Sequence, residues 1–167
     1  MEELREYLDY DPITGDVWWK KRPCVRGGKA GVGDICDTIN REGYKKLAFR
    51  YKTYLVHRVI FYLHYGYVPD YLDHKNCIKT DNRVENLRPA LQSENCQNIA
   101  ATKKNTSGFK GVSWHPHVNM WSVRISQNKK RYSIGYFKDK LMAARAYNKK
   151  ALELHGEFAR LNEIPNG

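Results

Sequence analysis

The sequence predicts an α+β protein, in which a β-rich N-terminal part with a core helix precedes a three-stranded antiparallel sheet plus one helix. Three patterns carry this prediction. Apolar residues recur at helical spacing between Leu55 and Leu63, and they alternate with polar residues from Trp121 to Ser126 as in a half-buried strand. An amphipathic pattern then runs from Asp139 to His155.

The N-terminal part reads as short strands joined by turns. Asp11-Pro12 and Thr14-Gly15 are typical turn pairs, and the β-prone stretches 17–19 and 44–54 follow them. The helix over 55–63 should end before Gly66, because glycine is a common helix terminator.

The middle of the chain predicts a strand, a polar loop, a second strand and a helix. The strand ends at 71–74, the loop covers 75–85, and a short strand surrounds Leu87. Ser93 is the expected N-cap of a helix to about residue 101. Residues 102–107 have linker composition, so we expect one domain over 1–101 and another over 108–163.

Charge is concentrated in the second domain. The chain has a net charge of +11, and residues 101–167 hold 13 Lys or Arg against 4 Asp or Glu. Such an excess predicts a polyanionic partner, and nucleic acid is the commoner one for a chain with this many aromatic residues.

Several classes of protein are disfavoured. The chain lacks a signal-peptide pattern and any apolar run near the roughly 18 residues of a membrane span, so we expect a cytoplasmic protein without membrane contact. The four cysteines form no C-x-x-C pair. No structural zinc is therefore expected, and reduced thiols are the simpler interpretation.

Asp73-His74 lies in the segment LDHKN, Asn86 follows His74 by 12 residues in TDNRVENLR, and Asn95 follows 9 residues later in SEN. Over about 25 residues this pattern resembles the ββα-metal site of HNH endonucleases, especially phage homing enzymes, with the core at about 70–101. The resemblance implies that Asp73 and Asn95 bind one Mg²⁺ or Mn²⁺, that His74 is the general base, and that Asn86 orients its imidazole.

Residue chemistry agrees with these roles. Histidine titrates near neutral pH, and an asparagine oxygen can accept an imidazole N–H and select one tautomer. Taken singly, each of these asparagines is explained as well by turn or cap chemistry. Cys77 stands where relatives usually have a turn glycine. His57 precedes the site, and a packing or phosphate-contacting role suits it better than metal binding.

Five segments of the second domain form a recognisable framework: Ser107 to Val112, Trp121 to Ile125, Ile134 to Phe137, Ala143 to Tyr147 and Leu161-Asn162. Over about 55 residues this framework resembles the plant ethylene-response-factor (Apetala-type) DNA-binding domain. The resemblance implies that the sheet enters the major groove of double-stranded DNA. The implied contacts, with two added phosphate anchors at 129 and 130, are Lys110, Ser113, His115, Arg124, Ser126, Lys129, Lys130, Arg131 and Ser133.

Two functions from different classes follow. The first is a site-preferring, metal-dependent endonuclease of the nicking or homing kind, acting as a monomer and encoded by a bacteriophage or similar element. The alternative is a non-catalytic, sequence-specific DNA-binding regulator that keeps the HNH fold as a scaffold. RNA binding ranks last, because it leaves the metal-site pattern unexplained.

Overall fold

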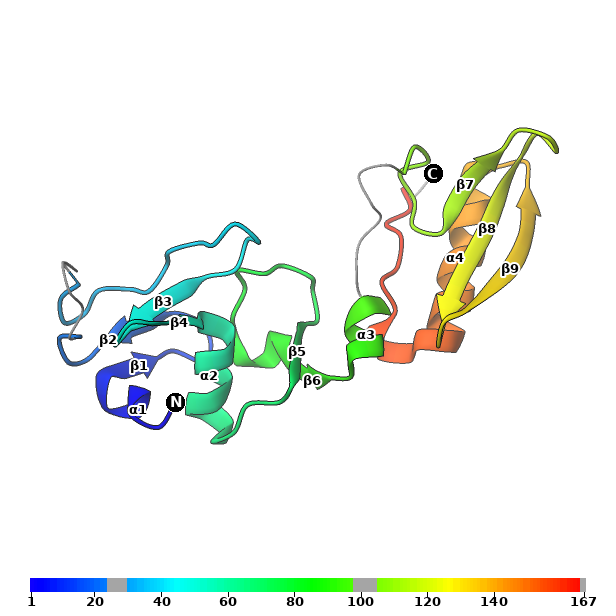
Figure 1. Ribbon diagram of the computed structural model, residues 1–167. Helices are drawn as coiled ribbons and strands as arrows, with labels where there is room; N and C mark the ends of the chain where they lie inside the picture. Colours follow the sequence, from blue (N-terminus) through cyan, green and yellow to red (C-terminus); the bar gives the residue numbers. More distant parts are fainter. Residues whose placement is uncertain (24–29, 98–104, 166–167) are drawn as a thin grey trace. The chain divides into compact units, whose positions relative to one another are not determined.

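The computed structural model describes residues 1–23, 30–97 and 105–165, without the side chains of 95–97. The chain folds into two compact units, Met1–Ala90 and Leu91–Gly167, each described here by itself (Figure 1). Both combine small antiparallel sheets with few helices, which confirms the mixed α and β composition. Within the described ranges, no helix has the length and apolar character needed to cross a bilayer.

The first unit contains three two-stranded antiparallel sheets, β1–β2, β3–β4 and β5–β6. Its elements are α1 (Leu4–Tyr7), β1 (Leu8–Tyr10), β2 (Val17–Trp19), β3 (Lys46–Phe49), β4 (Lys52–Leu55), α2 (Val56–Tyr65), β5 (Tyr71–His74), the 3₁₀ turn η1 (Val84–Asn86) and β6 (Leu87–Ala90).

Helix α2 provides the centre of this unit. Val56, Val59 and Ile60 recur at helical spacing and are fully buried, as the sequence predicts. The helix ends at Gly66, whose φ of 84° is readily adopted only without a side chain, and its N–H bonds to the carbonyl of Tyr62. The predicted core helix and its end are confirmed.

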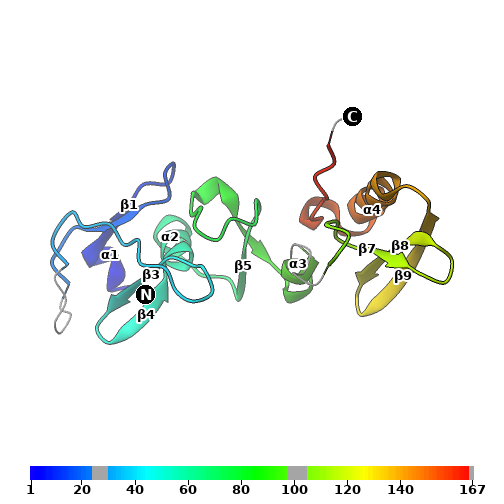
Figure 2. The same cartoon turned by 90° about the horizontal axis from the view of Figure 1, so that it is seen from above.

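The second unit is a three-stranded antiparallel sheet of order β7-β8-β9 with α4 packed against one face (Figure 2). Its elements are α3 (Gln92–Gln97), β7 (Val112–His115), β8 (Met120–Gln127), β9 (Lys130–Phe137), α4 (Lys140–His155) and the 3₁₀ turn η2 (Gly156–Phe158).

The core of this sheet lies between β8 and α4. Val123 and Ile125 of β8 meet Ala143 and Tyr147 of α4, and all four are buried. Alternation along β8 therefore turns one face to the helix and leaves the other polar, as predicted. Tyr132 pairs with Ile125 and so lies on the same face of the sheet, but it is near the start of β9, at the margin of this core, and is 38% exposed.

Two details around the expected linker differ from the sequence prediction. Helix α3 begins at Gln92, so Ser93 lies inside the helix and is not its N-cap; instead a carboxylate oxygen of Glu94 accepts the Leu91 N–H at 2.6 Å. Residues 98–104, which include the predicted helix end, lie outside the described residues. Ser107 is buried, and its hydroxyl donates to the carbonyl of Val112 at 2.8 Å, so the expected linker ends in a bonded turn.

Candidate active site

The β5–β6 hairpin places the first two predicted site residues at the end of a strand. Asp73 pairs in register with Arg88, and His74 pairs with Leu87. Asp73 and His74 are 6% and 5% exposed, although charged and polar side chains are usually solvated. Buried polar groups need partners, so the contacts of these two side chains indicate what the site is built to do.

Asn82 orients His74. Its Oδ1 lies 3.1 Å from Nε2 of His74, and both side chains are buried. Because a carbonyl oxygen only accepts hydrogen bonds, this contact requires the proton on Nε2 and leaves the lone pair on Nδ1. Burial lowers the pKa of His74, against the opposing effect of Asn82 and Asp73, which favours the neutral imidazole that a base requires.

Asn86 was expected to orient the imidazole, but its described contacts go to the loop. Its Oδ1 accepts the Asn76 N–H at 3.0 Å, and its Nδ2 donates to Asn76 Oδ1 at 3.0 Å and to the Asp81 carbonyl at 2.8 Å. Both amide hydrogens are thereby used. Asn86 holds the loop between the strands, and the amide beside Nε2 belongs to Asn82.

Cys77 occupies a left-handed position in this loop, with φ of 62°. A side chain at such a φ is uncommon, and glycine is the usual residue there. Cys77 therefore adopts a backbone conformation that glycine takes more readily than other residues.

Asp73 is bound by Arg88 across the hairpin. Its Oδ2 accepts from Nε at 3.0 Å and from Nη2 at 2.9 Å, and both side chains are less than a tenth exposed. The guanidinium fixes the direction of the carboxylate. Arg88 was not anticipated from the sequence, although strand pairing of 71–74 with the segment around Leu87 would have brought it opposite Asp73.

The fit of a metal ion rests on the chemistry of these donors. Within the described ranges, no three His, Cys, Asp or Glu side chains gather where they could hold an ion. Asp73 offers a hard carboxylate oxygen of the type that Mg²⁺ and Mn²⁺ prefer, beside a buried imidazole. Asn95, the second expected ligand, lies on α3, and its side chain is outside the described part. Among the described residues of the hairpin, Asp73 is therefore a donor whose chemistry suits a divalent cation.

Two further rings pack against His74. His57 from α2 lies edge-on to it with ring centroids 4.9 Å apart, and Tyr44 lies 5.2 Å from His57 and 6.0 Å from His74. Burial lowers the pKa of His57 to about 3, so this ring is neutral, and its Nδ1 is buried without a hydrogen-bond partner among the described residues. These contacts support the packing role predicted for His57, whereas Tyr44 was missed.

The residues predicted to contact DNA lie mainly on the face of the sheet opposite α4. Cross-strand pairs Arg124–Ser133 and Ser126–Arg131 place four of them together, and all four are exposed. Ser113, on β7, pairs with Ser122. The other predicted residues are His115 at the end of β7, Lys110 before it, Lys129 in the β8–β9 turn and Lys130 at the start of β9.

Comparisons with known proteins find one family model and two viral relatives. A family model described as HNH endonuclease matches residues 54–97, which include Asp73, His74, Asn86 and Asn95. The chain is 33% identical over 122 residues to Protein 3.8 of Escherichia phage T7, covering 72% of this chain and 98% of that protein. It is also 33% identical over 112 residues to an uncharacterized HNH endonuclease of Acanthamoeba polyphaga mimivirus, covering 65% of this chain and 57% of that protein. No solved structure matches.

Proposed function

This chain belongs to the family that includes Protein 3.8 of Escherichia phage T7, and because it carries an HNH endonuclease domain we propose that it is a metal-dependent DNA endonuclease. The reaction is hydrolysis of a phosphodiester bond in double-stranded DNA. The observation that carries this proposal is the buried His74, oriented by an amide oxygen beside the buried carboxylate of Asp73.

His74 acts as the general base. With the proton on Nε2 and Asn82 holding it, Nδ1 takes the proton of the attacking water. Burial keeps the imidazole neutral and therefore ready to accept this proton. Asn86 acts indirectly, because it holds the loop that carries Asn76 and Asp81.

Asp73 and Asn95 hold the divalent cation, Mg²⁺ or Mn²⁺. When bound, such a cation stabilises the negative charge that develops on the scissile phosphate and on the leaving oxygen. Arg88 fixes the carboxylate of Asp73 through its two bonds to Oδ2. The guanidinium also offsets the charge of this buried carboxylate.

The second unit holds the DNA. Its exposed sheet face carries Arg124 and Arg131, and a sheet can enter the major groove, where base edges are read. One HNH centre per chain favours nicking of a single strand by a monomer. Because the centre and this module belong to one chain, sequence preference of the module favours cutting near a preferred site, as in a homing enzyme.

The test is cleavage of supercoiled plasmid by wild type, His74→Ala and the control His117→Ala, with Mg²⁺, with Mn²⁺ and with EDTA. His117 is exposed in the turn after β7, so its loss should leave cleavage unchanged. We expect open-circular product only with metal, and binding without cleavage for His74→Ala. If the folded wild type binds DNA but cuts none with either metal, the chain is a DNA-binding regulator.

A further inference from the structure

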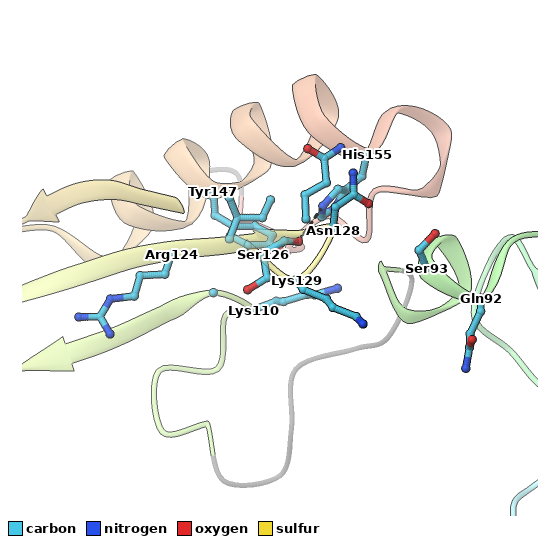
Figure 3. Close-up of a pocket in the computed structure, with 12 residues that line it drawn as sticks. Gln92, Ser93, Lys110, Arg124, Ser126, Asn128, Lys129, Tyr147 and His155 are labelled. Atoms are coloured by element: carbon cyan, nitrogen blue, oxygen red, sulfur yellow. Dashed lines mark hydrogen bonds between the residues drawn. The ribbon is translucent and has the colours of Figure 1, made fainter. Parts of the chain in front are cut away.

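A pocket of about 880 Å³ opens in the second unit, beside the β8–β9 turn (Figure 3). The segments around it are the start of α3, the residues just before β7, the second half of β8 with the turn that follows it, and α4. Lys110, Ser126, Lys129 and His155 line it, and no described residue that lines it is acidic. Figure 3 shows the side chains of Lys110 and Lys129 pointing to the same side, whereas Arg124 points the opposite way. The pocket is therefore positively charged.

The pocket lies along an edge of β8 that β7 does not cover. β7 pairs with β8 from Met120 to Val123, and the Arg124 N–H bonds to the Gly111 carbonyl at 2.9 Å. Beyond that point the side chain of His155, and not a neighbouring strand, contacts the backbone of β8. Its Nε2 lies 3.1 Å from the carbonyl oxygen of Ser126. A backbone carbonyl only accepts hydrogen bonds, so Nε2 carries the proton.

His155 is left with an unsatisfied nitrogen. The residue is 8% exposed, and its Nδ1 has no hydrogen-bond partner among the described residues. Burial lowers the pKa of His155, against the opposing effect of the Ser126 carbonyl, so the ring is neutral and Nδ1 holds a lone pair. Buried polar atoms without partners are rare in native proteins, and a bound ligand can supply the missing partner.

The two lysines are held in position by their backbones. The Lys110 N–H donates to Asn162 Oδ1 at 2.6 Å, and Asn162 Nδ2 donates back to the Lys110 carbonyl at 3.1 Å. Lys129 occupies a left-handed position, φ 62°, in the two-residue turn from β8 to β9. Both ammonium groups are therefore carried on ordered backbone and not on a variable loop.

We propose that this pocket seats a backbone phosphate of DNA between Lys110, Lys129 and His155, and that His155 takes up a proton from solvent as the phosphate binds. The inference rests on the proposed DNA binding. An anionic oxygen beside Nδ1 favours the protonated ring, which donates from both nitrogens. Burial raises the pKa of Tyr147 to about 12, so its hydroxyl stays neutral, and Arg124 is the other charged side chain that lines the pocket.

The first measurement is the affinity for a duplex in EDTA as a function of salt. Lys129→Gln should weaken binding to all sequences alike and reduce the slope of log K against log salt by about 1, the signature of one lost phosphate contact. Lys149→Gln, which removes an equal charge from an exposed position on α4, is the matched control. Equal slopes for Lys129→Gln and wild type would overturn the proposal.

The second measurement is proton uptake, from calorimetric titration at pH 6.5 in two buffers of different ionisation enthalpy. His155→Gln keeps a side-chain donor for Ser126 and should take up about one proton fewer than wild type, with folding checked by circular dichroism. The control His117→Gln should match wild type in this respect. Unchanged uptake in a folded His155→Gln variant would refute the role of His155.

Further outcomes distinguish a DNA phosphate from a free anion, and failure of the pocket proposal from failure of the proposed DNA binding. Inorganic phosphate that competes at micromolar concentration would indicate a site for a free anion and would overturn the assignment to DNA. Wild type that binds no duplex at any salt concentration would remove the proposed function itself. If wild type binds duplex and the variants bind it identically, only the proposed phosphate pocket is refuted.

Discussion

Asn82, and not Asn86, is hydrogen-bonded to the imidazole of His74, with Oδ1 3.1 Å from Nε2. The two asparagines lie four residues apart in one loop and have separate tasks. Asn82 selects the tautomer of His74, the proposed base, whereas Asn86 bonds to Asn76 and to the Asp81 carbonyl. The two roles predict different consequences when each amide is removed.

Asn82→Ala should reduce the cleavage rate by about 10- to 100-fold, the usual cost of losing the partner that orients a catalytic side chain. Asn82→Asp keeps an acceptor for Nε2–H and should recover part of the rate. Duplex affinity in EDTA should be unchanged in both. Asn86→Ala should instead lower the melting temperature as the loop loses three hydrogen bonds. If Asn82→Ala cuts at the wild-type rate, Asn82 does not orient the base.

Gly15, which is distant in sequence, also influences the position of Asn82. Its φ is +74°, and a Cβ there would lie 2.5 Å from the Arg83 nitrogen and from the Asn82 carbonyl carbon. The turn of residues 11–15 thus packs directly on the backbone that presents Asn82. Gly15→Ala should lower both the cleavage rate and the melting temperature, because backbone atoms must move.

Gly33→Ala is the matched control for that change. Gly33 also has positive φ, +89°, but a Cβ there would meet nothing within 4 Å. It should therefore lose only the cost of the left-handed backbone, about 1 to 2 kcal/mol of conformational stability, without loss of cleavage per folded molecule. Equal cleavage losses in the two variants would indicate strain alone and would remove the link between Gly15 and Asn82.

Arg88→Met removes the guanidinium from the buried carboxylate of Asp73 and should destabilise the first unit by about 3 kcal/mol. The double variant Asp73→Asn with Arg88→Met should recover part of this loss, because no buried charge then remains. Urea unfolding of the single and double variants gives the coupling energy. A coupling energy near zero would show that the ion pair contributes nothing to stability.

The sequence predicted more of the fold than of the contacts within the site. Regular periodicity sufficed for α2, the β5–β6 hairpin and the sheet with α4, because burial of one face decides such elements. Asp73 and His74 were identified from the resemblance of the surrounding residues to HNH endonucleases. The contact of Asn82 with His74 was not anticipated, since the spacing of residues along a loop does not determine which asparagine faces the imidazole.

Contacts between distant segments were also beyond pattern analysis. Tyr44 reaches His57 and His74 from a loop that precedes β3, about 30 residues before the hairpin. Arg88 meets Asp73 only through the strand register, and His155 meets Ser126 only where β7 ends short of β8. Each of these depends on tertiary packing, for which one sequence offers no periodic signal.

The loop that carries Asn82 should be sensitive to acid through Asp81. Hydrogen bonds from the Arg83 side chain, followed by those from Asn76, lower the pKa of Asp81 to about 2 from its ordinary 3.8. A carboxyl whose pKa is depressed on folding stabilises the native state above its unfolded pKa, and this contribution is lost as pH falls through the folded pKa. The window is therefore pH 4 to 2.

Asp81→Asn should remove this contribution, which is about 1 kcal/mol once solvent screening at the partly exposed Arg83 is allowed for. Urea unfolding at pH 7 should then show a less stable variant, and the difference from wild type should shrink between pH 4 and 2. Glu85→Gln, which alters the exposed partner on the other side of Arg83, should show little change at either end. The difference in unfolding free energy between wild type and Asp81→Asn could instead stay constant down to pH 2. Asp81 would then titrate alike in the folded and unfolded chains, and its bonds to Arg83 would not hold the loop.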